Sequence, residues 1–212
     1  MKIAIVGGAI IPEKLIKDIQ DSVFVIGVDR GAHWLITKGI VPDLAIGDFD
    51  SVNDGEFEMI KKSVKVVKKF PPEKDFSDLE LAVDEATKLN PRSIAIYGAT
   101  GGRLDHFFTA AFLLKKILAA KIPAKLIDED HEILLVDKKS SFEKSKKIKY
   151  FSIFPFSPIC RVSLKGFKYN LSEKTLRFGD TIGLSNEIKS GKAEIDVANG
   201  TLLIVRSSGR PA

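Results

Sequence analysis

The first two-thirds of the chain alternates short β-branched runs with longer amphipathic runs, and this alternation restricts the fold more than any other feature. The short runs predict strands over residues 2–7, 23–29, 43–48, 64–70, 93–98 and 124–128. The longer runs predict helices between them, over residues 13–20, 32–39, 55–63, 77–89 and 104–118. Because strands and helices that alternate in this way form a parallel sheet with helices on both faces, we expect an α/β fold.

The pattern changes near residue 138, where Lys and Ser become frequent. Short alternating segments follow, at residues 150–156, 160–167, 180–186, 193–197 and 201–207, and no helix is predicted among them. Asn199-Gly200 lies between the last two segments and is a strong hairpin signal, because both residues tolerate positive φ. We therefore expect an N-terminal parallel-sheet α/β domain over residues 1–137 and a small antiparallel all-β domain, a sandwich or a barrel, over residues 138–212.

Composition excludes several classes of protein. Hydrophobic residues make up 44% of the chain and charged residues 29%, and no apolar run approaches the ~20 residues that a membrane span requires. The first residues suit a β-strand better than a signal peptide, so we expect a cytoplasmic protein with no membrane contact. The net charge of +5 is mild, and the lysine clusters favour solvated faces over a nucleic-acid groove. The single cysteine, Cys160, excludes an intrachain disulfide and is expected to be a buried strand residue.

Polar and Gly-rich segments follow four of the predicted strands. They are Asp29-Arg30-Gly31, "GDFDS" at residues 47–51, "PPEKDFSD" at residues 71–78 and "ATGGRLDH" at residues 99–106. In parallel α/β sheets, ligands bind beyond the carboxyl ends of the strands, and these segments all lie at that edge. We therefore expect the functional site there.

Asp48 and Asp50 are two residues apart, a spacing that directs both side chains to the same side of an extended segment. Two carboxylates placed in this way suit Mg²⁺, which takes one or two protein carboxylates together with water and substrate phosphate. The alternative is that Asp50 caps the helix that begins near Asn53, while Asp48 is only exposed.

In "EKDFSDLELA", Ser77 and Glu80 form a capping box at the start of a helix. Asp75 and Asp78 lie on either side of that cap, either with a functional role or because the helix dipole favours carboxylates there. Lys74 is either a phosphate contact or a surface lysine.

"GATGGRLDH" combines glycines at positions 98, 101 and 102 with a helix that opens near Leu104, which would direct free N–H groups at an anion. Arg103 adds a planar set of donors suited to phosphate oxygens. The stretch fits neither the dinucleotide nor the Walker A pattern, so a Gly-rich turn without a ligand stays open. His106 is either functional or a buried helical histidine packed on Phe107 and Phe108.

Four segments in this order, "GDFDS", "KDFSD", "GATGGRLDH" and "SNE" at residues 185–187, resemble the motifs of the thiamine pyrophosphokinase family. The layout of an α/β domain followed by a β domain is similar as well, so the resemblance covers essentially the whole chain. It implies transfer of a diphosphate group from ATP to the hydroxyethyl oxygen of thiamine, which gives thiamine diphosphate and AMP and requires Mg²⁺. It also implies a homodimer with the active site between subunits, where the N-terminal domain holds ATP and the partner's β domain helps to hold thiamine.

The resemblance assigns roles to individual residues. The implied catalytic residues are Asp48, Asp50, Asp75, Asp78 and Arg103, and Mg²⁺ would be held by Asp48, Asp50 and Asp78. The implied nucleotide- and substrate-binding residues are Asp29, Lys74, Thr100, Gly101, Gly102, Asp105, His106, Ser185 and Asn186. Two departures stand out: Arg30 replaces the second residue of the family's usual D-G-G-A segment, and Ser77 replaces threonine but keeps the hydroxyl.

Three other functions are compatible with parts of the pattern. A diphosphokinase of the same build that acts on another hydroxymethyl heterocycle, such as a pterin alcohol, would carry the same cluster. A nucleotide-binding module without turnover would need only the nucleotide contacts. A magnesium-dependent phosphohydrolase is less favoured, since its D-x-D pair normally follows the first strand and here the pair follows the third predicted strand.

Overall fold

The computed structural model describes residues 1–209 and has two compact units, which divide between Glu129 and Asp130. This division falls earlier than the boundary expected at residues 137 and 138. The reason is a strand that the sequence did not predict, β7 (His131–Val136), which pairs antiparallel with β13 (Leu202–Ser207) of the second unit.

The first unit is built on a parallel sheet with the strand order β4-β3-β2-β1-β5-β6. The strands are β1 (Lys2–Val6), β2 (Phe24–Val28), β3 (Leu44–Gly47), β4 (Val67–Lys69), β5 (Ser93–Tyr97) and β6 (Ala124–Ile127). All the predicted strands of this region are therefore present. The direction of strand addition reverses between β1 and β5, which is the position where sheets of this type bind ligands.

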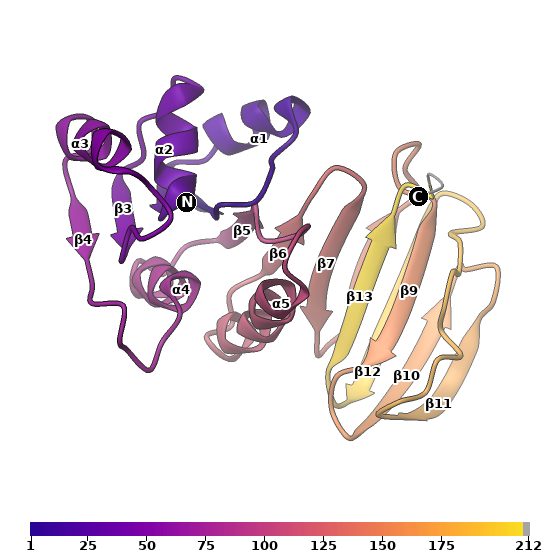
Figure 1. Ribbon diagram of the computed structural model, residues 1–212. Helices are drawn as coiled ribbons and strands as arrows, with labels where there is room; N and C mark the ends of the chain where they lie inside the picture. Colours follow the sequence, from indigo (N-terminus) through magenta and orange to yellow (C-terminus); the bar gives the residue numbers. More distant parts are fainter. Residues whose placement is uncertain (210–212) are drawn as a thin grey trace. The chain divides into compact units, whose positions relative to one another are not determined.

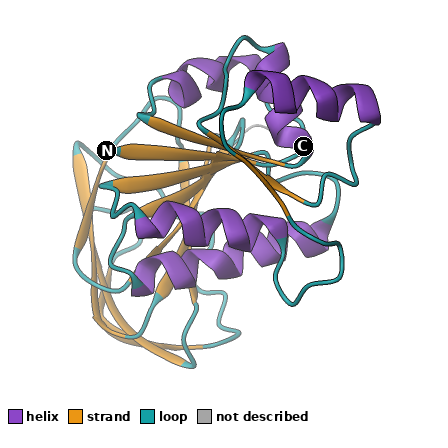
Figure 2. Ribbon diagram, turned by 90° about the vertical axis from the view of Figure 1, so that its left-hand side faces the viewer, coloured by secondary structure: helices purple, strands orange, loops and turns teal. Residues whose placement is uncertain are grey.

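Helices cover both faces of this sheet. They are α1 (Ile16–Gln20) after the 3₁₀ turn η1 (Glu13–Leu15), α2 (Arg30–Thr37), α3 (Asp54–Ser63), α4 (Asp78–Lys88) and α5 (Leu104–Ala119). Figure 1 shows α1, α2 and α3 on one side of the strands and α4 and α5 on the other, and Figure 2 shows the strands between the two helical layers. The central strands are accordingly apolar throughout, with Ile3 and Ile5 of β1 fully buried.

Local capping determines where two of these helices begin. Asn53 accepts a hydrogen bond from the Glu56 N–H at 2.9 Å, and the Glu56 carboxylate accepts one from the Asn53 N–H, so a capping box starts α3. Asn53 and not Asp50 is therefore the cap, and the capping alternative for Asp50 is wrong. At α4, Ser77 accepts from the Glu80 N–H at 3.2 Å, which confirms Ser77 as the cap.

The second unit contains two antiparallel sheets, ordered β7-β13-β9 and β11-β10-β12-β8. The remaining strands are β8 (Ser140–Glu143), β9 (Tyr150–Pro155), β10 (Ile159–Lys165), β11 (Leu171–Arg177) and β12 (Lys192–Asn199). One hydrophobic core takes side chains from both sheets, for example Phe151 and Ile204 from one and Val162 and Ile195 from the other. The expected all-β domain is therefore a sandwich.

The Asn199-Gly200 hairpin prediction is wrong. β12 pairs with β10 and β8, whereas β13 pairs with β7 and β9, so this turn carries the chain from one sheet to the other. Gly200 does have a positive φ of 87°, and a side chain there would begin 2.5 Å from the Ile159 carbonyl oxygen. The glycine is thus required by a close crossing between sheets.

Two further features of this unit differ from the sequence prediction. Residues 180–186 form turns and a single bridge between Phe151 and Asn186 instead of a strand. β8 and β11 were not predicted, because most of their side chains are exposed and polar and so give no clear alternation. Cys160 is fully buried in β10, as predicted.

Within residues 1–209, none of the helices combines the length and the apolar composition needed to cross a membrane.

Candidate active site

Three aspartates from three different strand ends meet at the carboxyl edge of the parallel sheet. Asp29 follows β2, Asp48 follows β3, and Asp78 opens α4 after the loop that follows β4. Each offers one carboxylate oxygen, and these three oxygens lie within 4.8 Å of one another. We call these residues the aspartate trio. Its members are distant in sequence, and the parallel topology brings them together.

Asp29 is held in an unusual backbone conformation, with a φ of 47°. Its Oδ1 accepts a hydrogen bond from the Phe49 N–H at 3.1 Å, which ties the end of β2 to the loop after β3. Gly47 leaves the space for this carboxylate, because a side chain there would begin 1.7 Å from Asp29 Oδ1. The last residue of β3 therefore has to be glycine for Asp29 to reach the trio.

Asp50 does not join the trio, and the backbone of Phe49 explains why. The spacing of two residues places side chains on one side only in an extended segment, whereas Phe49 has a φ of 61°. The Phe49 ring is buried and packs on Phe57 at 4.9 Å between centroids. Asp48 is largely buried, whereas Asp50 is exposed, and the Asp50 N–H donates to Asp48 Oδ1 at 3.1 Å.

Lys74 lies against the trio. Its Nζ donates to Asp48 Oδ2 at 3.3 Å and to the Pro71 carbonyl oxygen at 3.1 Å, and it lies 3.2 Å from Asp78 Oδ1. Only 12% of the Lys74 side chain is exposed, and the exposed fractions of the Asp48 and Asp78 side chains are similar, at 11% and 16%. The contact with Asp78 is an ion pair that is not aligned as a hydrogen bond. Asp78 Oδ1 is buried, and no hydrogen bond to it is recorded within residues 1–209.

Burial and like charge separate the acidities of these groups. Burial, together with the charges of Asp78 and Asp48, raises the pKa of Asp29 to about 7. Burial alone would also raise the pKa of Asp48, but the Asp50 N–H and the Lys74 ammonium lower it below its usual value. For Asp78 burial outweighs the attraction of Lys74, so its pKa is raised. Asp48 is therefore the carboxylate most firmly ionised.

The Gly-rich turn after β5 has the backbone that the sequence predicts. Gly98, Gly101 and Gly102 have φ values of 63°, 87° and 78°. Gly101 and Gly102 border open space, since no atom lies within 4 Å of the point where a side chain would begin. Helix α5 begins at Leu104, and the side chain of Arg103 does not cap it. The start of α5 can thus receive an anion, and its His106 N–H already interacts with the Asp105 carboxylate.

Arg103 and Asp105 form an exposed pair at the start of α5. Arg103 Nε lies 3.2 Å from Asp105 Oδ1, and Nη2 lies 2.5 Å from Oδ2. The hydrogen bonds from Arg103 lower the pKa of Asp105 to about 2. His106 is exposed, so its interpretation as a buried histidine is wrong, while Thr100 is half-buried. Within residues 1–209, the recorded ion-pair partner of Arg103 is Asp105 and not a member of the trio.

Arg30 can stand where the family usually has glycine, because the position that closely approaches the backbone is the next one, Gly31. A side chain at Gly31 would begin 2.1 Å from the Val6 carbonyl oxygen, whereas Arg30 is exposed. Gly7, directly after β1, packs in the same way, since a side chain there would begin 2.6 Å from the Gly98 carbonyl oxygen. Gly7 was not predicted as a site residue, although the glycine pair after the first strand was a usable signal.

Ser185 and Asn186 lie in the second unit and differ in kind. Ser185 is exposed, has a φ of 54°, and its N–H donates to Ser152 Oγ at 3.0 Å. Asn186 is buried, and its side chain makes three hydrogen bonds: Oδ1 accepts from the N–H groups of Tyr169 and Glu187, and Nδ2 donates to the Tyr169 carbonyl oxygen. Ser185 thus offers an exposed hydroxyl with no hydrogen bond recorded to residues 1–209, whereas Asn186 holds two loops together.

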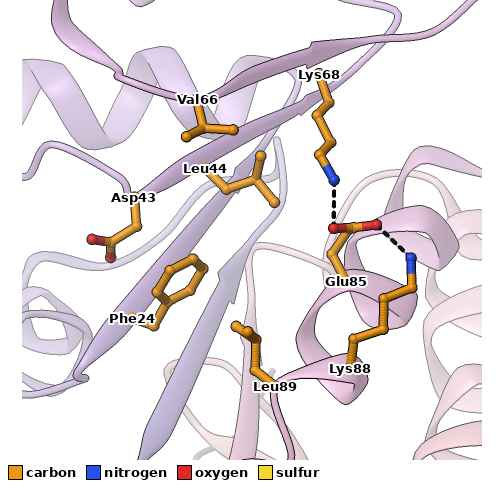
Figure 3. Close-up of a pocket in the computed structure, with 8 residues that line it drawn as sticks. All are labelled: Phe24, Asp43, Leu44, Val66, Lys68, Glu85, Lys88 and Leu89. Atoms are coloured by element: carbon orange, nitrogen blue, oxygen red, sulfur yellow. Dashed lines mark hydrogen bonds and ion pairs between the residues drawn. The ribbon is translucent and has the colours of Figure 1, made fainter.

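A pocket of about 210 Å³ lies at the opposite edge of the parallel sheet, near the starts of β2 and β3 (Figure 3). Phe24, Leu44, Val66 and Leu89 form its apolar part. Three of its charged side chains pair with one another, because Glu85 binds Lys68 at 2.6 Å and Lys88 at 2.7 Å, and the fourth, Asp43, accepts a hydrogen bond from the Val25 N–H at 2.8 Å. It is therefore separate from the candidate active site.

The structure thus brings together Asp48, Asp78 and Lys74, and adds Asp29, which the sequence assigned to nucleotide binding but not to the metal. Asp50 and Asp75 are exposed outside the trio. The trio suits a hard divalent cation, since its donors are all carboxylate oxygens and one of them, Asp78 Oδ1, is buried without a hydrogen bond.

Comparison with known protein families gives two matches that together span most of the chain. Residues 16–126 match the model of the thiamin pyrophosphokinase catalytic domain, and residues 135–202 match the model of the thiamin pyrophosphokinase vitamin B1 binding domain.

Individual relatives agree with the family matches. The chain is 37% identical over 203 residues to a thiamine pyrophosphokinase of Bacillus subtilis, covering 93% of this chain and 95% of the relative. The crystal structure of a B. subtilis thiamine pyrophosphokinase superposes with a TM-score of 0.91 at 35% identity, over 99% of this chain and 100% of that one. The thiamin pyrophosphokinase of Geobacillus thermodenitrificans gives a TM-score of 0.86 at 32% identity, over 98% and 97%.

Proposed function

The chain belongs to the thiamin pyrophosphokinase family, and we propose that it transfers a diphosphate group from ATP to the hydroxyethyl oxygen of thiamine, with Mg²⁺ as the metal. The observation that carries this proposal is the aspartate trio with Lys74 at the carboxyl edge of the sheet. Nucleotide chemistry that depends on a metal ion needs such a set of oxygen ligands next to a basic residue.

We propose Asp48 and Asp78 as ligands of Mg²⁺, with Asp29 as the third carboxylate of the trio. Asp50 stays in the proposed set, since it is exposed beside Asp48 and its N–H donates to Asp48 Oδ1. When bound, the ion would neutralise charge on the phosphate oxygens of ATP. The buried Asp78 Oδ1, which accepts no hydrogen bond, supports this assignment.

The phosphates of ATP are proposed to lie over the Gly-rich turn. The open positions of Gly101 and Gly102 let a phosphate approach the backbone, and the start of α5 favours an anion. Arg103, Lys74 and Asp75 are proposed contacts from the two flanking loops. Thr100, Asp105 and His106, on the same turn and helix start, complete the proposed nucleotide set.

The reaction follows from positioning and charge neutralisation and uses no covalent enzyme intermediate. The hydroxyl oxygen of thiamine attacks the β-phosphorus of ATP. The bond between the β-phosphorus and the oxygen that bridges it to the α-phosphorus breaks, and AMP leaves with that oxygen. The hydroxyl proton passes to a carboxylate of the site as the new bond forms. The two products are thiamine diphosphate and AMP.

Thiamine is proposed to contact the β domain through Ser185, whose hydroxyl is exposed, with Asn186 next to it. We further propose a homodimer, with the site between subunits and the β domain of one subunit serving the partner, as the family resemblance implies. A cytoplasmic location and the absence of a nucleic-acid partner are also proposals, and both rest on composition and charge.

The assay for this function measures AMP formed from ATP and Mg²⁺ with thiamine, with a pterin alcohol, and with no acceptor. We expect AMP only with thiamine, and AMP formed with the pterin alcohol instead would favour the alternative diphosphokinase. Asp48→Asn should lower kcat by about a hundredfold, since it removes one charged ligand.

Asp43→Asn is the matched control, because Asp43 lies at the opposite edge and its Oδ2 accepts from the Val25 N–H at 2.8 Å, which an amide oxygen can also do. Equal activity of the two variants would remove the aspartate trio from the proposed site.

A further inference from the structure

Lys74 supplies the positive charge that keeps the aspartate trio together. Its ammonium lies 3.3 Å from Asp48 Oδ2 and 3.2 Å from Asp78 Oδ1, and the side chain is 12% exposed. In the part of the chain that the structure describes, Lys74 is the basic residue recorded in an ion pair with this trio. Asp48 and Asp78 approach each other because this cation lies between them.

The ammonium and a metal ion would bind the same carboxylates. Mg²⁺ binds carboxylate oxygens at about 2.0–2.1 Å, and the hydrogen bond from Lys74 to Asp48 uses a lone pair that this ligand could give to the metal. Two cations on the same pair of carboxylates also repel each other. Lys74 in its present position therefore competes with a metal ion.

The Lys74 ammonium can also exchange one set of acceptors for another. A lysine side chain is flexible and its ammonium is a point charge, so it gives up one set of acceptors for another more readily than a bidentate arginine. Its third contact is the Pro71 carbonyl oxygen, in a loop where Pro71, Pro72 and Glu73 are exposed. The contact with Asp78 lacks hydrogen-bond alignment.

We propose that Lys74 holds the metal site before substrate binds, keeps free divalent ions out, and moves from the carboxylates to the phosphates when the metal arrives with ATP. This inference rests on the proposed function for the identity of the nucleotide. It adds an order of events: the nucleotide-free protein binds the metal weakly, and nucleotide and metal strengthen each other's binding, as thermodynamic linkage requires.

The test measures Mn²⁺ binding to the full chain without nucleotide, by the loss of the free-ion signal in electron paramagnetic resonance. Lys74→Met removes the charge but keeps the length of the side chain, and it should tighten Mn²⁺ binding about tenfold. Lys74→Arg keeps the charge and should not tighten it. The control is Lys68→Met, whose lysine pairs with Glu85 at 2.6 Å, and it should change the affinity by less than about twofold.

A gain in Lys74→Met no larger than in Lys68→Met would overturn the proposal. Asp48→Asn on top of Lys74→Met should abolish the gain, and a gain that persists would place the metal elsewhere and overturn it as well. The Mn²⁺ measurement does not depend on turnover, which the AMP assay described above measures separately. A chain that is inactive in that assay but shows the gain would fail the proposed function and keep this inference. An active chain without the gain would do the reverse.

The wild-type protein gives a second measurement if Lys74→Met does not fold. Isotope-labelled lysine allows nuclear magnetic resonance of the Lys74 ε-carbon, assigned by its loss in Lys74→Arg. The signal should stay in place with millimolar-range Mg²⁺ alone and shift when α,β-methylene ATP is added with Mg²⁺. An equal shift with Mg²⁺ alone, or no shift under either condition, would contradict the exchange.

Discussion

At the residue scale, the site is governed by the crowding of carboxylates around one ammonium. Asp48 is neutralised by Lys74 and stays ionised, whereas in residues 1–209 no recorded ion pair joins a cation to Asp29. Asp29 instead has its pKa raised to about 7 by burial and by its charged neighbours. Near neutral pH the Asp29 carboxyl therefore holds its proton part of the time, which limits the self-repulsion of the trio until a metal ion takes over that role.

This raised pKa makes folding stability depend on pH. The folded protein holds the Asp29 proton up to about pH 7, whereas an unfolded chain releases it near the ordinary value of 3.8, so the folded state binds more protons in between. Stability contributed at this position is thus fully present below about pH 4 and is lost as the pH rises through about 7.

Asp29→Asn removes that dependence, because asparagine cannot ionise and its Oδ1 can still accept from the Phe49 N–H. Urea unfolding without divalent ions should show the variant gaining stability relative to the wild type as the pH rises from about 4 to 8. A stability difference that stays constant between these two pH values would show that the Asp29 proton is not held as described.

At the scale of elements, strand ends and the turns after them place the functional groups. Gly47 ends β3 without a side chain so that Asp29 can lie above it, and Gly31 opens α2 against the Val6 carbonyl oxygen. In the second unit, Asn186 performs the same kind of task with hydrogen bonds, because it joins the turn at Tyr169 to the segment that carries Ser185.

Neighbouring residues in that segment should therefore respond differently to substitution. Asn186→Ala removes a buried side chain that partners the partly buried backbone groups of Tyr169 and Glu187, and we expect a loss of about 2 kcal/mol in the free energy of unfolding. Ser185→Ala, at an exposed position, should change it by less than about 0.5 kcal/mol while raising the KM for thiamine. Urea denaturation and steady-state kinetics measure both; equal stability of the two variants would contradict the clamp role of Asn186.

At the scale of the whole molecule, the sequence predicted the architecture well where burial is complete. The strands of the parallel sheet are buried on both faces and separated by amphipathic helices, so the pattern is strong. The sequence pattern is weaker in the sandwich, where β11 is mostly exposed. At Asn199-Gly200, the local turn signal does not indicate which sheet the chain enters next.

The order of the motifs likewise predicted that Asp48, Lys74 and Asp78 meet at one edge of the sheet. It did not predict that Asp29 would replace Asp50 in the trio. That outcome depends on the φ of Phe49 and on the buried position of its ring, which neither spacing nor residue type reveals.

The most direct test of the central claim follows the phosphorus atoms. ATP labelled at the β-phosphorus, thiamine and Mg²⁺ are incubated with the purified chain, and the products are identified by phosphorus nuclear magnetic resonance and mass spectrometry. The account predicts equal amounts of AMP and thiamine diphosphate, with the label in thiamine diphosphate. ADP with thiamine monophosphate, or AMP that forms equally well without thiamine, would contradict it.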